Sequence, residues 1–478
     1  MTNFIKIAWR NLWRNKRRTL ITAASILFAV FFANLMRSFQ TGSYDYWINS
    51  TIESYTGHMQ IQHPDYKNNP VIDNLIPFDT ALIDQIHQIE KVKTVNPKLQ
   101  SFALASSGNQ TKVVMVQGII PENEAQISKL NEQIVQYRLT PDAIDAIKLQ
   151  IGNKKLADKL DVNINQSYAK QGKLELDLGL DVATDNNVIE VIKAQSKFAG
   201  SYLAPSDNGV LIGDKLAKFL DIVPGDTLVL MGQGYQGQNA AGKFPVRGIV
   251  KMNNPMLDKS VVYMHLNSAQ QLYSALTPDS VMLISSLSVV LNSKSDNAIE
   301  QVKNKIVKLS IPYQYQLSDW KELNMELMQQ IESDKKSGQI FIGILYLIIG
   351  FGIFGTVLMM TMERKREFGV MVAIGTQKVR LAIIMFVEMI YLAIIGVIAG
   401  FVASLPFIYL GHYYPLRFTG EMAKMYEDMG FEPVMPMALF DWYMWEQAVT
   451  VFFIVALATL YPVITILKLN VIKSIRGR

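Results

Sequence analysis

Residues 363–380 read ERKREFGVMVAIGTQKVR, and this charged stretch with two glycines separates two long apolar segments. The segment before it is GQIFIGILYLIIGFGIFGTVLMMTM (338–362), and the segment after it is LAIIMFVEMIYLAIIGVIAGFVASLPFIYL (381–410). A helix needs roughly 20 apolar residues to cross the hydrocarbon core of a bilayer. Both segments meet that length, so residues 363–380 are predicted to lie at a membrane surface between two spans.

Composition and length place the chain in a broad class. It has 478 residues, a mean hydropathy of +0.15 and no cysteine. These values are typical of a membrane protein with a sizeable soluble part, and the lack of cysteine excludes disulfides, thiolate catalysis and cysteine-bound zinc. Four segments are apolar over the required length: about 19–39, 338–362, 380–410 and 444–467. The third has roughly 30 residues, so it should be tilted, broken near Pro406 or longer than the bilayer is thick.

Lysine and arginine predict the orientation, because they concentrate in short cytoplasmic flanks. They cluster before the first span, within 363–380 and after the last span. The segment 411–443, in contrast, has only two basic residues, Arg417 and Lys424. Both termini are therefore predicted to be cytoplasmic, with 43–336 and 411–443 on the other side of the membrane. No small-residue cleavage site follows the first span, so we expect it to be retained.

The predicted fold class is an α-helical membrane protein with four transmembrane helices and a large mixed α/β extracytoplasmic domain between helices one and two. The predicted order begins with an amphipathic helix (1–18), the first span (19–42) and the α/β domain with its stalk (43–336). The second span (337–362), a cytoplasmic element (363–379) and the third span (380–410) follow. A periplasmic loop (411–443), the fourth span (444–468) and a cytoplasmic tail (469–478) complete the chain.

Periodicity predicts the elements of the α/β domain. The predicted strands are 59–62, 111–120, 209–213, 226–231, 244–250, 259–266 and 287–292, and the predicted helices are 82–89, 214–220, 267–276 and 296–309. Residues 129–196 look like a separate insert with a polar helical part, followed at 173–182 by KLELDLGLDV, whose alternation predicts a strand. Glu175, Asp177 and Asp181 would form its solvated face. Residues 313–337 are polar and are predicted to be a helical stalk that leads into span two.

Small residues recur within the spans, and residues 3–15 form an amphipathic pattern. One face of 3–15 is apolar with two tryptophans and the other is basic, which suits a helix in the inner membrane interface. Four-residue spacing of small side chains allows close helix approach, and it occurs at Ser25, Ala29 and Ala33 and at Gly396, Gly400 and Ser404; span two has Gly343, Gly350, Gly352 and Gly355. These positions fit either packing among the four spans or a dimer contact.

Sequence motifs give no catalytic or metal site. GQNAAGKF (237–244) resembles a phosphate-binding loop, but Phe244 stands where magnesium binding needs Ser or Thr, so we interpret it as a glycine-rich hairpin. The five histidines have no metal-ligand or triad spacing, and we do not expect an enzyme. Glu388 within span three is a functional candidate as an intramembrane acid. A structural or interfacial role is favoured, because the long span would place it near the cytoplasmic headgroups.

A helix through 368–379 would place Phe368, Met371, Val372 and Gly375 on one side. The stretch is too charged to enter the bilayer and too apolar for an ordinary solvated loop. It is therefore either an amphipathic element offered to a partner or a surface turn that binds nothing, and physical reasoning alone leaves both open.

Resemblance adds to this interpretation. ERKREFGVMVAIGTQKVRLAIIMFVE (363–388) is similar to the element that follows the second span in FtsX/MacB-type ABC transporter permeases, and IAWRNLWRNKRRTLIT (7–22) resembles the opening of that superfamily. The end of the chain, YPVITILKLNVIKSIRG, resembles the family's end but has Asn470-Val471 where a proline step is usual. Within the superfamily, 56–66, 116–128 and 208–231 resemble the lipoprotein-releasing LolC/LolE branch. Residues of about 129–196 lie outside the resemblance.

The resemblance implies a location, with the spans in the inner membrane and 43–336 and 411–443 in the periplasm, and it implies a mechanism. Such permeases work as two chains, related or identical, with a separate cytoplasmic ATPase, so ATP-Mg would bind the partner and this chain would need no cofactor. ATP-driven motion would pass through a coupling element and a stalk to the external domain, which would release a lipoprotein to a periplasmic carrier; no nucleic acid is implied. The implied coupling residues are Glu363, Arg364, Arg366, Glu367, Phe368, Gly369, Met371, Val372, Ala373 and Gly375. A lipid or substrate cavity would include Phe28, Phe32 and Met36, and helix packing would use Ser25, Ala29, Gly396 and Gly400.

Two alternatives remain open. One is a MacB-like efflux permease, although such proteins usually carry their ATPase on the same chain. The other is a membrane-anchored sensor or scaffold without transport, which binding of an ATPase would exclude.

Overall fold

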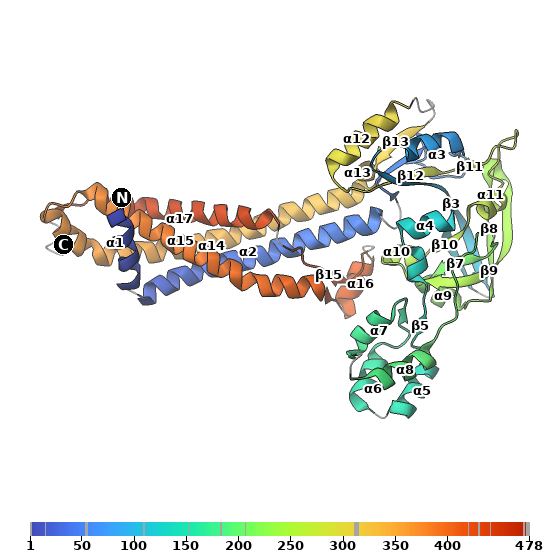
Figure 1. Cartoon of the computed structure of the whole chain (residues 1–478), viewed down its shortest axis with the longest axis horizontal. Coiled ribbons are helices and arrows are strands. Elements are labelled where there is room, and N and C mark those ends of the chain that lie inside the picture. The colour runs from blue at the N-terminus through green and yellow to red at the C-terminus, as the bar shows by residue number, and fades with distance from the viewer. Residues whose placement is uncertain are drawn as a thin grey trace. The chain divides into compact units, whose positions relative to one another are not determined.

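The computed structural model describes the chain except residues 1, 15, 53–55, 109, 152, 182–183, 206, 310–314, 419, 429–430, 440, 472–473 and 475–478, and except the side chains of residues 2–5 and 18. The chain divides into two compact units (Figure 1). The helical unit comprises residues 1–46, 326–418 and 434–478, and the α/β unit comprises residues 47–325 and 419–433.

Long helices run side by side in the helical unit (Figure 1). The elements are α1 (Thr2–Arg14), α2 (Lys16–Thr51), α14 (Met325–Ala373), α15 (Lys378–Tyr413), α17 (Tyr443–Leu467) and the paired strands β14 (Leu416–Arg417) and β15 (Val434–Met435). Among the described residues, α2 from Thr19, α14, α15 and α17 are long and apolar enough to cross a membrane. The prediction of four spans is thus confirmed by length and composition. Helix α15 continues through Pro406 to Tyr413, so the third span is long and unbroken.

Apolar and polar contacts both hold these helices together. Their shared core includes residues from α1 and all four long helices: Leu12, Ile26, Val30, Ile353, Val357, Leu392 and Val455. The polar contacts cross between helices. Asn34 Nδ2 donates to Ser404 Oγ at 3.4 Å, and the hydroxyl of Tyr346 donates to the side-chain oxygen of Gln447. Within hydrocarbon such groups need a partner, so these pairs fix the register of the helices as well as their contact.

Glycines of α15 allow close packing against α2. A Cβ atom on Gly396 would lie 2.5 Å from the Ile26 Cβ, and one on Gly400 would lie 2.7 Å from the Leu27 carbonyl oxygen. Ala29 of α2 is buried, and the Ser25 hydroxyl donates to the Ile21 carbonyl of its own helix. For α15, the small-residue stripe therefore packs within the chain. In α14 the space around Gly343, Gly352 and Gly355 is open among the described residues.

Replacing Gly400 with leucine should destabilise the helical unit, because the new side chain would overlap the α2 backbone. Overpacking of this kind costs about 1–3 kcal/mol. The matched control is Gly343→Leu, whose side chain would enter open space. Thermal unfolding of both purified variants in the same detergent measures the difference, and equal transition temperatures would contradict the α2–α15 packing.

The described residues of the α/β unit form one large sheet, the two short strand pairs β2–β11 and β5–β6, and covering helices. Its elements in chain order are β1 (Met59–Gln62), β2 (Ile76–Pro77), α3 (Thr80–His87), β3 (Val92–Ser107), β4 (Gln110–Ile119), α4 (Pro121–Ile127), η2 (Leu130–Gln133), β5 (Tyr137–Arg138), α5 (Pro141–Ile151), α6 (Lys154–Val162), β6 (Ser167–Tyr168), α7 (Gln171–Leu178), α8 (Asn186–Ser196), β7 (Val210–Gly213), α9 (Asp214–Leu220), β8 (Thr227–Gln233), η3 (Tyr235–Gly237), β9 (Asn239–Val250), α10 (Pro255–Asp258), β10 (Val261–His265), α11 (Leu266–Leu272), β11 (Leu283–Ile284), β12 (Ser286–Leu291), α12 (Asp296–Val307), β13 (Gln316–Asp319), α13 (Trp320–Leu323) and α16 (Gly420–Asp428).

Strand β3 organises the large sheet, whose order is β13-β1-β12-β3-β4-β10-β7-β9-β8. Strand β8 also pairs with β3, so the six strands from β3 to β8 form a closed ring. The first part of β3 pairs with β12 and the second part with β4. Each predicted strand of the list above, apart from 173–182, appears in the sheet, but β3 itself was not predicted, because Pro97 and polar residues interrupt its alternation.

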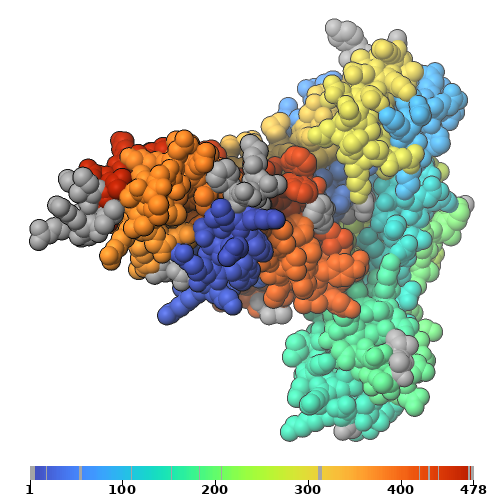
Figure 2. Space-filling view, turned by 60° about the vertical axis from the view of Figure 1, so that its left-hand side comes forward, coloured from blue at the N-terminus to red at the C-terminus, as the bar shows by residue number. Residues whose placement is uncertain are grey.

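Residues of the predicted insert form a small helical lobe with its own core (Figure 2). The core side chains come from α5 to α8 and the strands between them: Leu139, Ile144, Ile147, Leu156, Leu160, Tyr168, Leu174, Leu178 and Ile192. The boundary differs from the predicted 129–196. Leu130 and Ile134 pack in the core of the main sheet with Leu211 and Val250. The lobe begins and ends instead where Tyr137 bridges Lys197.

The strand predicted at 173–182 is wrong, because residues 171–178 form helix α7. Leu174 and Leu178 are buried at four-residue spacing, whereas Leu176 between them is 54% exposed. Gly179 adopts a left-handed φ of 63° and ends the helix, with its N–H donating to the Leu176 carbonyl. The alternation of leucines in the sequence also satisfies a helical stripe, and the glycine at the helix end favours that choice.

The predicted helical stalk over 313–337 is correct only in its second part. Residues 316–319 form strand β13, which pairs with β1, and α14 begins at Met325. From there a single helix of 49 residues continues to Ala373. The second span and most of the predicted cytoplasmic element are thus parts of one helix.

Part of the loop predicted at 411–443 packs on the α/β unit. Helix α16 is held there by two ion pairs, Lys215 Nζ to Glu427 Oε2 at 2.5 Å and Lys259 Nζ to Asp428 Oδ1 at 3.7 Å. The rings of Trp47 and Phe431 also stack with centroids 4.2 Å apart. The connection between α15 and α17 therefore contributes a helix to the α/β unit, and the chain passes between the two units four times.

Excision of 139–196, with two glycines joining the ends, should leave the rest of the chain folded. The cut keeps Arg138, whose guanidinium donates to buried Asp214 at 2.8 Å, and it removes the separate core as a whole. Excision of 130–195 is the matched control, and it should unfold the α/β unit because Leu130 and Ile134 are lost. Protease resistance and thermal unfolding compare the two variants, and equal stability would contradict the boundary at residue 137.

Candidate functional site

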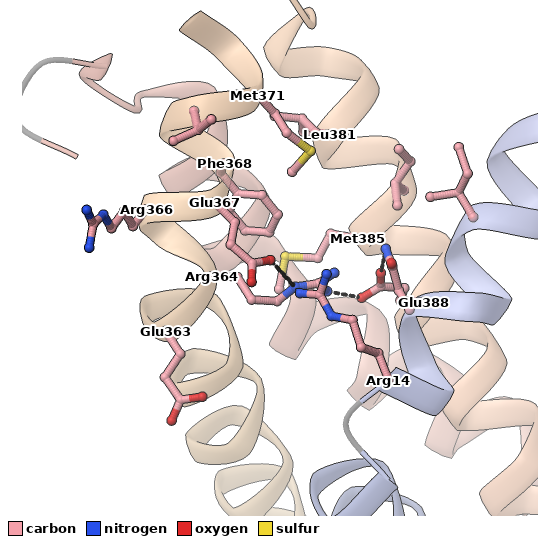
Figure 3. A pocket seen from close by; sticks show the side chains of 14 residues that line it. Arg14, Glu363, Arg364, Arg366, Glu367, Phe368, Met371, Leu381, Met385 and Glu388 are labelled. Carbon is pink, nitrogen blue, oxygen red and sulfur yellow. Dashed lines mark hydrogen bonds and ion pairs between the residues drawn. The ribbon is translucent and has the colours of Figure 1, made fainter. Parts of the chain in front are cut away.

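A cavity of 590 Å³ lies between α1, α14 and α15 (Figure 3). Its lining comes from three separate parts of the sequence. Helix α1 contributes Ile7, Asn11 and Arg14; α14 contributes Glu363, Arg364, Arg366, Glu367, Phe368, Val370 and Met371; and α15 contributes Leu381, Ile384, Met385 and Glu388. Six of the residues predicted for coupling, together with the intramembrane acid Glu388, therefore line one cavity.

Helix α1 packs along α15 and forms one wall of the cavity. Ala8 and Leu12 are buried, and the rings of Trp9 and Tyr391 meet edge to face at 5.5 Å. Trp9 and Trp13 each keep 44% of their surface exposed. The helix is thus amphipathic as predicted, and its buried side faces α15.

A chain of charges crosses the cavity (Figure 3). Glu388 accepts hydrogen bonds from Asn11 Nδ2 at 2.6 Å and from an Arg364 Nη atom at 2.7 Å. Glu367 in turn accepts from Arg14 at 2.5 Å, and its carboxylate lies 3.7 Å from the Arg364 Nε. The Glu388 side chain is 2% exposed, and that of Arg364 is 17% exposed. Glu388 thus joins α1, α14 and α15 as a buried ion-pair partner.

The turn after α14 depends on Gly375. Its φ of +103° lies in a region that other residues avoid, and its N–H donates to the Val372 carbonyl at 3.0 Å. Thr376 donates to the Met371 carbonyl, so the last carbonyls of the helix are satisfied. Helix α15 then starts at Lys378, which gives a tight connection between the two long helices.

The structure corrects which side of 363–375 faces outward. Phe368 and Gly369 are buried, and Met371 and Val372 pack against the helical core, so the apolar face predicted for a partner faces this chain's own helices. The exposed side consists of Glu363, Arg366, Glu367, Val370, Ala373 and Ile374, followed by Gly375.

Three apolar residues on this exposed side were missed by the sequence analysis. Val370 is 43% exposed, Ile374 is 79% exposed and Val379, just after the turn, is 58% exposed. A signal for the first two was present in the sequence: residues 363, 367, 370 and 374 follow helical spacing as regularly as the face that was chosen. We call Val370, Ile374 and Val379 the apolar tip.

The three residues predicted for a lipid cavity do not share one environment. Phe28 and Phe32 are 55% and 50% exposed on α2, and their rings stack at 6.3 Å. Met36 packs against the helical core instead.

The glycine-rich stretch 237–244 lies mostly in a strand. GQNAAGKF continues into strand β9 and has no helix after it, so a phosphate-binding loop is absent from that stretch. Within the part of the chain that the structure describes, no group of three His, Asp or Glu residues could hold a metal ion.

One comparison with known families covers α15 and most of α14, two of the three helices that line the cavity. Residues 339–471 match the family model described as FtsX-like permease C-terminal. This match supports the resemblance to FtsX/MacB-type ABC transporter permeases, and it does not distinguish the LolC/LolE branch from the MacB branch. No curated protein matches the chain.

Two solved structures overlap with the chain at low similarity. One is the extracellular domain of the noncanonic ABC-type transporter YknZ from Gram-positive bacteria, with 14% identity over 55% of this chain and 99% of that chain and a TM-score of 0.28. The other is the periplasmic region of MacB from Actinobacillus actinomycetemcomitans, with 14% identity over 60% of this chain and 98% of that chain and a TM-score of 0.30. Similarity at this level carries no conclusion about function.

Glu388→Gln should destabilise the helical unit by up to about 3–5 kcal/mol, because it removes the nearest counter-charge of Arg364 and leaves only the more exposed Glu367, 3.7 Å from the Arg364 Nε. The control Glu363→Gln changes an exposed carboxylate on the same wall and should shift stability by less than about 0.5 kcal/mol.

A double variant, Arg364→Met with Glu388→Met, should recover most of the stability lost in Glu388→Gln, because it removes both buried charges. Chemical unfolding followed by circular dichroism measures all three. A double variant as unstable as Glu388→Gln would mean that the loss does not come from the unpaired charge.

Proposed function

We propose that this protein is the permease subunit of an ABC transporter, coupling ATP hydrolysis by a separate cytoplasmic subunit to conformational change outside the membrane. The supporting observation is the apolar tip. Ile374 is 79% exposed at the end of a 49-residue helix, beside charged residues that exclude it from lipid. Exposed apolar side chains surrounded by charged residues are typical of a protein-binding surface.

The architecture supports transmission rather than transport through a pore. Helix α14 is continuous from Met325 to Ala373, so no loop interrupts it between its charged end and its other end. The buried ion pair between Arg364 and Glu388 ties that end to α15. The proposal also includes α16, which lies in the connection between α15 and α17 and is ion-paired to Lys215 and Lys259 within the α/β unit.

For the substrate we propose a lipoprotein that is released from the inner membrane to a periplasmic carrier. This step rests on the resemblance of 56–66, 116–128 and 208–231 to the LolC/LolE branch. MacB-like efflux is the second candidate, and the family match supports it equally. Purification from the native membrane distinguishes them, since a second, related permease favours lipoprotein release and an ATPase alone favours efflux.

Ile374→Asp should abolish copurification of the ATPase subunit while the permease stays folded. The substitution places a charge in the centre of the apolar tip, where desolvation on binding becomes unfavourable. The matched control is Leu149→Asp, an equally exposed apolar residue of the α/β unit at 88% exposure.

Mass spectrometry identifies the proteins that copurify with the tagged permease and with each variant. Loss of the ATPase in Ile374→Asp alone supports the coupling assignment. Retention of the ATPase in that variant contradicts it, and absence of any ATPase from the unmodified protein favours the sensor or scaffold alternative. Glu367 is less suitable for this test, because its substitution also removes the ion pair with Arg14 between α14 and α1.

A further inference from the structure

A second cavity, of 940 Å³, lies at the end of α15 that is remote from the chain termini. Its volume is in the range of small-molecule sites, about 300–1,000 Å³. The lining includes Leu405, Pro406, Tyr409, Tyr413, Tyr414 and, from the segment that leads into α17, Leu439. Among the described residues that line it, none carries a charge.

The wall opposite α15 is held in place by hydrogen bonds. Ala438 N donates to the Ser38 carbonyl at 2.9 Å, and the Ser38 hydroxyl donates back to the Ala438 carbonyl at 2.7 Å. Met437 packs so closely on α15 that a Cβ atom on Gly411 would lie 2.6 Å from its sulfur. The segment carrying Leu439 is therefore fixed against α2 and α15 by contacts within this chain.

Aromatic residues place the cavity at a membrane interface. Tyr409, Tyr413 and Tyr414 are 60%, 56% and 62% exposed, and Trp442 and Trp445 are 71% and 56% exposed. Tyrosine and tryptophan gather where acyl chains meet headgroups. The rings of Tyr409 and Tyr413 lie 4.7 Å apart at the rim, with apolar side chains such as Leu405 one turn deeper.

We propose that this cavity binds an acyl chain of a phospholipid from the leaflet opposite the chain termini. An apolar, uncharged lining disfavours water, which needs several polar partners. The tyrosine hydroxyls at the rim can donate hydrogen bonds to the ester carbonyls of the lipid, where the chain leaves the cavity. The site is formed by α15, by Tyr414 just after it and by Leu439, which precedes α17. It does not include Phe28 or Phe32 of α2.

The experiment uses the full-length protein in vesicles of phosphatidylethanolamine and phosphatidylglycerol that contain a phosphatidylcholine with a photoreactive diazirine on one acyl chain. After irradiation, peptide mass spectrometry compares labelling of residues 405–414 and 439 with labelling of the exposed apolar face of α14 around Ile348 and Phe351. We expect several-fold higher labelling at the cavity.

Two variants separate cavity binding from general lipid contact. Leu405→Trp fills the cavity and should reduce the labelling to the level of the α14 face, whereas Ile398→Trp, on an exposed part of the same helix, should leave it unchanged. Circular dichroism and thermal unfolding of both variants check that they fold. A second arm replaces the probe with a diazirine-bearing triacylated lipopeptide.

Labelling equal to that of α14, or labelling that survives Leu405→Trp, overturns the proposal. Labelling by the lipopeptide and not by the phospholipid also overturns it, because the site would then belong to a lipidated substrate. None of these results depends on an ATPase, so the proposed function can fail while the lipid site stands.

Discussion

The buried pair between Arg364 and Glu388 is the contact on which the arrangement of the helical unit depends. Both side chains are taken out of solvent, which is costly unless each finds a partner in good geometry. Arg364 lies on α14, Glu388 on α15, and Asn11 of α1 supplies the second hydrogen bond to the same carboxylate. Because the pair must be formed inside the bundle, it fixes the rotation of α14 about its axis. That rotation places Phe368 inward and Ile374 outward.

This dependence explains why the exposed face of 363–375 was assigned wrongly from the sequence. Two stripes of this helix satisfy helical spacing. The sequence analysis chose the stripe with Phe368 and Met371 as the partner-facing side, because it is the more apolar of the two. Two tertiary contacts decide between them: the apolar core against which Phe368 and Met371 pack, and the partner of Arg364, which lies 24 residues further along the chain. The four spans, in contrast, follow from length and apolarity alone, and no tertiary contact was needed to find them.

The α/β unit shows the same division between local and tertiary signals. Strands such as β4 and β8 carry their own alternation and were predicted. Strand β3 is stabilised by neighbours on both sides, which allows it to contain Pro97 and to change partner midway. Helix α7 was assigned as a strand because its leucines satisfy both periods, and the burial of Leu174 and Leu178 in a helical lobe determines the outcome.

The continuity of α14 has a mechanical consequence. At 1.5 Å per residue its 49 residues span about 73 Å, so a tilt of about 10° at one end moves the other end by about 13 Å. The middle of this lever contains Gly343, Gly350, Gly352 and Gly355, and each glycine weakens a helix interior by about 1 kcal/mol relative to alanine. Bending under load would therefore concentrate in the middle third of α14. If α14 transmits motion as proposed, these glycines set how much of a displacement at Ala373 reaches Met325 and how much bends the helix.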